Sequence, residues 1–197
     1  MASATFTVPS AADNAWTISG FSSYVTDPGY LMVGKINASG TETAWIRFTN
    51  VTIPKGSTIN SAIVRLVSQG SSGTNARVIT KCAAADNPAM PTTYAATTAV
   101  ALTAGTDSGV INTSVVSIYQ LDIATALQAV VNRAGFASGN SVLVAIQDNG
   151  SSSVHGLYTD SYSTGATNRP RLEVDWTPPA STTLAVLVHS HRQQGIM

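Results

Sequence analysis

NSVLVAIQDNG at residues 140–150 and NRPRLEVDW at residues 168–176 decide the fold of this chain. Each stretch predicts a strand of period two, with one apolar face formed by Val142, Val144 and Ile146 in the first and Leu172, Val174 and Trp176 in the second. The other face of the second strand is too polar to bury and consists of Arg171, Glu173 and Asp175. One buried and one solvated face are typical of an antiparallel β-sandwich, which we expect to close near residue 176.

Most of the remaining chain is predicted as strands and turns. Alternation favours strands at residues 5–8, 16–19, 30–36, 43–53, 58–68 and 77–83, and two more within 99–121 around a loop at 104–109. The predicted inward set here is Ala44, Ile46, Phe48, Ala62, Val64 and Leu66. Trp45 and Arg47 are then expected to face outward. Two prolines in the stretch 84–98 predict an irregular crossing loop.

One helix is predicted, over residues 123–133. Its apolar side chains share a face at helical spacing and are Ile123, Leu127, Val130 and Val131. Asp122 is placed to cap its N-terminus, and Gly135 follows its end in the position of a C′ residue. A single short helix among about ten short strands predicts an all-β fold, a jelly-roll-like antiparallel β-sandwich, and not an α/β fold.

The chain divides into a predicted sandwich domain, residues 1–176, and a Pro-rich linker with a C-terminal arm, residues 177–197. Within the arm, Leu184, Val186 and Val188 form a short apolar, strand-like run. Such a run adds a strand to its own sheet or lies on a neighbouring subunit. We favour the inter-subunit arm, because a domain that closes at Trp176 offers no gap for another strand.

Composition excludes several classes of partner. The 197 residues include ten basic and ten acidic side chains, so no net field attracts nucleic acid or an anionic membrane. No apolar run approaches the roughly 20 residues that cross a bilayer.

The N-terminus has no basic and apolar regions typical of a secretory signal, so we expect either a removed signal or synthesis and use in a cytoplasm. Cys82, the one cysteine, is expected to be a small buried hydrophobe in a strand.

No catalytic or metal-binding constellation is visible in the sequence. The histidines, His155, His189 and His191, lie in a predicted turn and in the arm, where the H-x-H pair is weakly specific for a metal. Four carboxylates lie in turn contexts, where they cap their own backbone: Asp27, Asp86, Asp107 and Asp148. No pair of carboxylates is spaced for glycoside hydrolysis. We therefore expect no enzyme activity and no cofactor, with a structural Ca²⁺ on loop carbonyls left open.

Aromatic side chains are the remaining functional signal. Trp45 by its alternation, and Tyr158 and Tyr162 by their place near loops, are candidates for contact with a glycan or a partner protein. Aromatic rings beside polar side chains can stack on sugars. The alternative is that these rings cover a second sheet or a subunit interface, and we favour this alternative for a chain with so little charge.

Three stretches resemble a known family. AWIRFTNVTIPKGSTINSAIVRL (residues 44–66), residues 118–150 and ATNRPRLEVDW (residues 166–176) are similar to the DNRLRE-type, carbohydrate-binding-module-like domain. The similarity extends over roughly residues 10–176. The chain departs from the family pattern at Trp176, where a final Tyr is common, and over residues 84–110.

The resemblance implies a jelly-roll-like sandwich, which in this family serves as an adhesive or polysaccharide-binding module of secreted surface proteins. Similar variants that share the patterns V-x-I-P-x-G-A/S-T-I and R-A-G-W/F-x-S-G-N occur in tailed bacteriophages, and this chain reads VTIPKGSTI and RAGFASGN at these places. With no visible signal peptide, we expect a structural protein on the virion surface, and we favour a capsid decoration or cement protein over a tail component. Its expected partners are the major capsid protein, other virion proteins and further copies of itself. One rival function is a carbohydrate-binding or adhesion module. The other is an enzyme fragment, and the absence of an acid/base pair argues against it.

Overall fold

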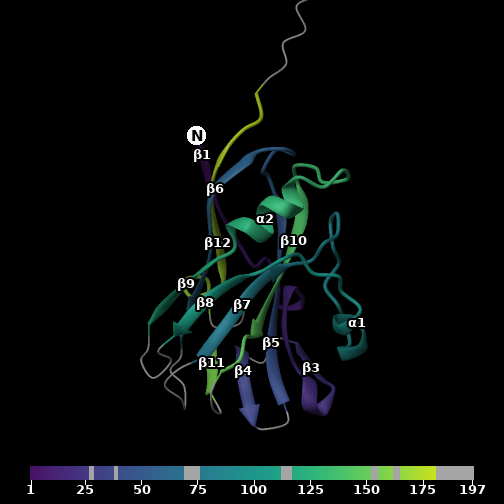
Figure 1. Ribbon diagram of the computed structural model, residues 1–197, viewed down its shortest axis with the longest axis vertical. Coiled ribbons are helices and arrows are strands. Elements are labelled where there is room, and N and C mark those ends of the chain that lie inside the picture. The colour runs from purple at the N-terminus through teal and green to yellow at the C-terminus, as the bar shows by residue number, and fades with distance from the viewer. Residues whose placement is uncertain are drawn as a thin grey trace, which may run out of the picture.

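The computed structural model is an all-β sandwich of two antiparallel sheets (Figure 1). It describes residues 1–26, 29–37, 40–68, 76–111, 117–151, 155–161 and 165–180, and for residues 36–37 and 155–158 it describes the backbone alone. The predicted fold class is therefore confirmed.

The four-stranded sheet, here called sheet A, has the order β1-β12-β6-β9. Its strands are β1 (Ala2–Thr7), β12 (Arg171–Thr177), β6 (Thr58–Val67) and β9 (Ile118–Asp122). The first and last strands of the described chain are thus neighbours, paired from Ala2 opposite Trp176 to Thr7 opposite Arg171.

The eight-stranded sheet, here called sheet B, has the order β11-β4-β5-β10-β7-β8, with β2 paired to β5 and β3 paired to β2. Its strands are β2 (Asn14–Ile18), β3 (Ser23–Thr26), β4 (Tyr30–Asn37), β5 (Gly40–Val51), β7 (Ala76–Cys82), β8 (Thr106–Ile111), β10 (Asn140–Asp148) and β11 (His155–Asp160). Two single turns of 3₁₀ helix flank β2, η1 (Ala11–Asp13) and η2 (Ser19–Phe21).

The predicted core is confirmed. Every side chain assigned to it by alternation is buried between the two sheets, namely Ala44, Ile46, Phe48, Ala62, Val64, Leu66, Val142, Val144, Ile146, Leu172, Val174 and Trp176. Side chains that alternate along a strand point to opposite faces, so one face of each strand supplies the interior. Cys82 is also fully buried here, and burial raises the pKa of its thiol to about 12.

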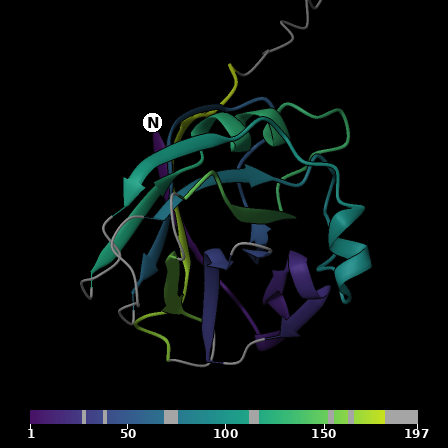
Figure 2. The ribbon, with the colours of Figure 1, turned by 60° about the horizontal axis from the view of Figure 1, so that its bottom comes forward.

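The predicted helix is α2 (Ala124–Val131), which contacts β6 of sheet A and β7 of sheet B at one end of the sandwich (Figures 1 and 2). Its apolar face is buried, as predicted. The N-cap residue is Ile123, and Asp122 Oδ1 accepts a hydrogen bond from the Ala124 N–H at 2.8 Å. The C′ role predicted for Gly135 is wrong. The helix ends at Val131, and a side chain at Gly135 would lie 2.5 Å from the Asp86 carboxylate, so the Asp86 side chain would have to shift to admit it.

Two local predictions differ from the structure between β7 and β9. The stretch 84–98 contains a second short helix, α1 (Tyr94–Thr98), where Thr93 Oγ1 accepts a hydrogen bond from the Ala96 N–H at 3.1 Å. The predicted loop at 104–109 is largely strand, because β8 begins at Thr106 and pairs with β7. Neither element has an apolar periodicity that would predict it from the sequence. The side chain of Thr93 caps α1, and β8 forms by pairing with β7.

Candidate functional site

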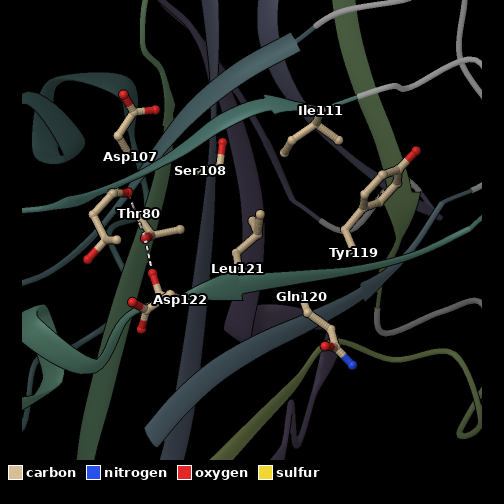
Figure 3. Close-up of a pocket in the computed structure, with 9 residues that line it drawn as sticks. Thr80, Asp107, Ser108, Ile111, Tyr119, Gln120, Leu121 and Asp122 are labelled. Atoms are coloured by element: carbon tan, nitrogen blue, oxygen red, sulfur yellow. Dashed lines mark hydrogen bonds between the residues drawn. The ribbon is translucent and has the colours of Figure 1, made fainter.

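An open cleft separates the edges of the two sheets on one side of the sandwich. β8 is the last strand of sheet B in the described residues, and β9 is the last strand of sheet A. The cleft between them has a volume of about 260 Å³ and is lined by Thr80, Thr106, Asp107, Ser108, Ile111, Tyr119, Gln120, Leu121 and Asp122. Figure 3 shows Ile111 and Leu121 reaching into the space between the strands, while Gln120 points away from it. The floor of the cleft is therefore apolar.

One end of the cleft is closed by a hydrogen bond between the sheets. The hydroxyl of Thr80 on β7 donates to the carbonyl of Asp122 at 2.6 Å and lies 3.2 Å from the carbonyl of Thr106 (Figure 3). Thr80 is itself buried. This contact fixes the separation of the two edges at the α2 end, and the cleft lies along the strands beyond it.

The edge of β8 is irregular. Its register with β7 shifts between Arg77 and Ile79, and Gly109 has a φ of +67°. In the shifted part, Ser108 Oγ accepts a hydrogen bond from the Val78 N–H at 3.2 Å and donates to the Val78 carbonyl at 3.0 Å. The Ser108 hydroxyl thus makes the two hydrogen bonds to Val78 that the backbone of β8 would make in a regular ladder. Bulges of this kind protect sheet edges from pairing with other chains.

An exposed ion pair flanks the bulge. Arg77 Nε donates to Asp107 Oδ2 at 2.9 Å, and the Gly109 N–H donates to Asp107 Oδ1 at the same distance. These hydrogen bonds, that from Arg77 first, lower the pKa of the Asp107 carboxyl to about 2. Asp107 therefore caps its own backbone, as predicted, and it also holds an arginine.

The edge of β9 is regular. Its five residues pair with β6 without a register shift, from Ile63 opposite Asp122 to Val67 opposite Ile118. The Ile123 N–H donates to the Ala62 carbonyl at 2.9 Å, and the Ser117 carbonyl accepts from the Ser68 N–H at 2.8 Å. In an antiparallel ladder such bonds recur at every second residue. The backbone groups of Ile118 and Gln120 therefore point away from β6.

Apolar side chains are exposed beside these edges. Val110 on β8 is 68% exposed and Ile118 on β9 is 48% exposed. Exposed single hydrophobes are common, but these two lie on the strands that flank the cleft, although neither lines it, and in the described residues Ile118 lies on an edge strand of sheet A. The combination is typical of a surface that another polypeptide covers.

The prediction that Trp45 is exposed on the outer face is wrong, while its contact with a glycan or a partner stays a prediction. Its side chain does leave the main core, but it is only 3% exposed. It belongs to a second apolar cluster with Ala83, Leu143 and Ala145, against which Met90, Val100 and Leu102 pack. The segment that contains α1 thus covers this part of the outer face of sheet B. Alternation gives the direction of a side chain, but it does not show whether a distant segment covers it.

A small hollow remains above Trp45. It has a volume of about 180 Å³ and is lined by Thr17, Ser19, Thr41, Thr43, Trp45, Tyr94, Thr97, Thr98 and Gln147. The Tyr94 hydroxyl donates to the Ser19 carbonyl at 3.4 Å, and Trp45 Nε1 donates to Thr17 Oγ1 at 3.2 Å. Every side chain in this lining is uncharged, so the hollow suits a neutral polar group and not an anion.

A buried carboxyl was not singled out by the sequence reasoning. Glu42 on β5 is 1% exposed, its Oε1 has no hydrogen-bond partner among the described residues, and burial raises its pKa to about 7. It lies opposite Ile18 of β2 and Gly34 of β4. The signal was available, because Glu42 shares the parity of Ala44 and Ile46 and therefore points inward. Glu42 lines neither the cleft nor the hollow described above.

Of the other predicted turn carboxylates that the structure describes, Asp148 caps its own backbone, whereas Asp86 pairs with a residue distant in sequence. Asp148 Oδ1 and Oδ2 accept from the backbone N–H groups of Ser151 and Gly150 at 3.3 and 3.2 Å, a capping role like that predicted. Asp86 pairs with Arg133 Nε at 2.8 Å and so connects the end of α2 to the stretch after β7. Asp27 lies outside the described residues.

The other predicted contact residues are not brought together by the described structure. The backbone of Tyr158 lies in β11, opposite Met32 of β4, and its side chain lies outside the described residues. Tyr162 and the arm residues Leu184, Val186 and Val188 also lie outside them, as do His189 and His191. His155 begins β11 and does not lie in the predicted turn.

Comparisons with other proteins add no family to this picture. In the part of the chain that the structure describes, no three His, Cys, Asp or Glu side chains gather where they could hold a metal, and no helix is long and apolar enough to span a bilayer. No protein-family model matches the chain, and no curated protein is significantly similar to it. The resemblance to the DNRLRE-type domain therefore stays a prediction.

Proposed function

We propose that this chain is a non-enzymatic structural protein of a bacteriophage virion, a decoration or cement protein on the outside of the head. The observation that carries the proposal is the open side of the sandwich, where, among the described residues, β9 has an unpaired edge beside the cleft that contains Ile111 and Leu121, and the two flanking strands carry the exposed Val110 and Ile118. A strand edge with apolar neighbours is suited to binding another polypeptide by strand addition.

The size of the cleft also favours a protein partner over a small substrate. Pockets for small ligands have volumes of about 300–1,000 Å³. The cleft has about 260 Å³ and the hollow above Trp45 about 180 Å³. The carboxylates of the cleft are engaged, Asp107 by Arg77 and Asp122 by the Ala124 N–H. The cleft thus offers side-chain recesses and a backbone edge, and no free acid/base pair.

The proposal is tested on heads assembled without this protein by the phage that encodes it. The purified full-length chain is expected to cosediment with such heads. Ile118→Lys is expected to weaken binding, because it places a charge at the free edge. Thr5→Lys, an exposed position on the outward face of β1, serves as the matched control. Failure of the full-length chain to bind heads, with its absence from purified virions by mass spectrometry, would refute the structural role.

A carbohydrate-binding module is the second candidate. The hollow above Trp45 favours it, because hydroxyl groups and the aromatic residues Tyr94 and Trp45 line it without any charge. Aromatic rings and hydroxyls are suited to a neutral sugar. A glycan array on the full chain tests this function: binding that is lost in Tyr94→Ala and kept in Thr5→Ala would support it. No binding to any glycan would leave the structural role as the better proposal.

A further inference from the structure

The structure points to an acceptor for the apolar arm. We propose that residues 184–188 of one copy of this chain pair with the free edge of β9 in a second copy. In this arrangement alternate side chains of the arm enter the cleft between β8 and β9. The inference deepens the structural role proposed above and rests on it for its biological setting.

The two edges beside the cleft are not equivalent acceptors. β8 carries a bulge, a glycine at positive φ and the Ser108 side chain within its ladder. β9 has a continuous register and no proline or lysine, residues that commonly block sheet edges. The backbone groups of Ile118 and Gln120 point toward the free side. An added strand would therefore find regular hydrogen-bonding groups on β9.

The arm matches this acceptor in its pattern of apolar side chains. Residues 184–188 read LAVLV, so a strand there presents Leu184, Val186 and Val188 on one face. The cleft floor offers Ile111 and Leu121 to that face. Its volume of about 260 Å³ suits aliphatic side chains and not a whole strand. The backbone of the arm would lie at the rim, along β9.

The path of the chain favours a second copy over the same one. β12 is antiparallel to β6, and β6 is antiparallel to β9, so β12 and β9 run in the same direction. Thr177 lies opposite Thr58, whereas the cleft begins at Asp122, opposite Ile63. The described chain therefore leaves at the end of the sandwich beyond the cleft and runs away from it (Figure 1).

The residues that follow β12 oppose a reversal. Pro178 and Pro179 fix their own φ, and each restricts the preceding residue to extended conformations. To reach its own β9, the arm would have to turn back directly after this stiff step and pass across β6 or α2. An arm that continues outward meets a neighbouring molecule instead.

Disulfide trapping tests the contact directly. Full-length Gln120→Cys is mixed with full-length Leu187→Cys, two positions expected on the outward face of the joined strands. Oxidation is expected to give a cross-linked heterodimer, while the native Cys82 is buried and takes no part. Thr5→Cys, on the other edge strand of sheet A, replaces Gln120→Cys in the control. Cross-linking that is equal or greater at Thr5 would overturn the assignment to β9.

Association in solution provides the second measurement. Analytical ultracentrifugation of the full chain is expected to show concentration-dependent self-association. Gln120→Pro removes an N–H that points to the free edge, and Gln120→Ala retains it. We expect Gln120→Pro to raise the dissociation constant up to about tenfold and Gln120→Ala to leave it unchanged, since one lost hydrogen bond is worth up to about that factor. Val186→Asp in the arm is also expected to raise the dissociation constant. It leaves the strands of the sandwich unaltered, so its effect does not depend on how a changed strand folds.

The outcomes separate this inference from the structural role. A full chain that stays monomeric at all concentrations, or self-association that neither variant weakens, would overturn the arm exchange. Binding of that monomer to phage heads would leave the structural role intact, with the arm on a capsid protein. Arm exchange in a protein that binds no head would support the inference and refute the structural role.

Discussion

Replacing Glu42 by Gln is expected to make the protein more stable at pH 8 and to change little at pH 5. Glu42 is buried on the inner face of β5, and desolvation raises its pKa from 4.5 to about 7. In the unfolded chain the carboxyl loses its proton near the lower value. Between the two values the folded state therefore binds more protons than the unfolded state, and the free energy of unfolding falls as the pH rises.

The magnitude follows from the two pKa values. One pKa unit corresponds to about 1.4 kcal/mol, so the separation between 4.5 and about 7 corresponds to roughly 3 kcal/mol. This destabilisation is absent below pH 4.5, develops up to pH 7 and is constant above it. A glutamine has nearly the same shape and stays neutral, so the substitution removes the cost of the buried charge without opening a cavity. The gain at pH 8 is a large fraction of the stability of a typical domain.

Urea denaturation at pH 5 and pH 8, at one ionic strength, measures the effect. The histidines titrate in the same range, so the quantity to compare is the difference between Glu42→Gln and the parent at each pH. Glu173→Gln is the matched control, because Glu173 lies on the outward face of sheet A. A difference between Glu42→Gln and the parent that is the same at both pH values would refute the reasoning.

Three further outcomes are expected. Leu127→Ala, which truncates a fully buried side chain of α2, should lower the free energy of unfolding by about 2–5 kcal/mol in the same assay. The Cys82 thiol should react with a thiol reagent only after unfolding, because it is buried and its pKa is raised to about 12; fast labelling of the folded chain would contradict this. A chain that ends at Pro178 should keep the melting temperature of the full chain but lose self-association, and a large fall in that temperature would place the arm in its own sheet.

The sequence by itself determined which way the side chains of the long strands point. Backbone geometry sends successive side chains to opposite faces, so the inward sets on β5, β6, β10 and β12 followed from alternation alone. The apolar face of α2 followed in the same way from helical spacing. These rules are local, and they apply wherever a strand or helix is long enough to show its period.

What lies against a side chain was decided by the tertiary structure. Trp45 points out of the main core as alternation predicts, yet residues that include Met90 and Leu102 cover it. Glu42 points inward with Ala44, yet its pKa depends on what surrounds it in the folded chain. Burial is set by segments that are distant in sequence, and no pattern within one strand encodes them.

The candidate site likewise exists only in the folded chain. β8 and β9 are short and weakly patterned, and their residues carry no motif. They form a cleft because, in the part of the chain that the structure describes, pairing places each of them last in its sheet, and because Thr80 and Asp122 join the sheets at one end. The sequence supplied the apolar arm as a period-two run. The free edge that can accept it was decided by the order of the strands, since strand order depends on contacts between residues far apart in the chain.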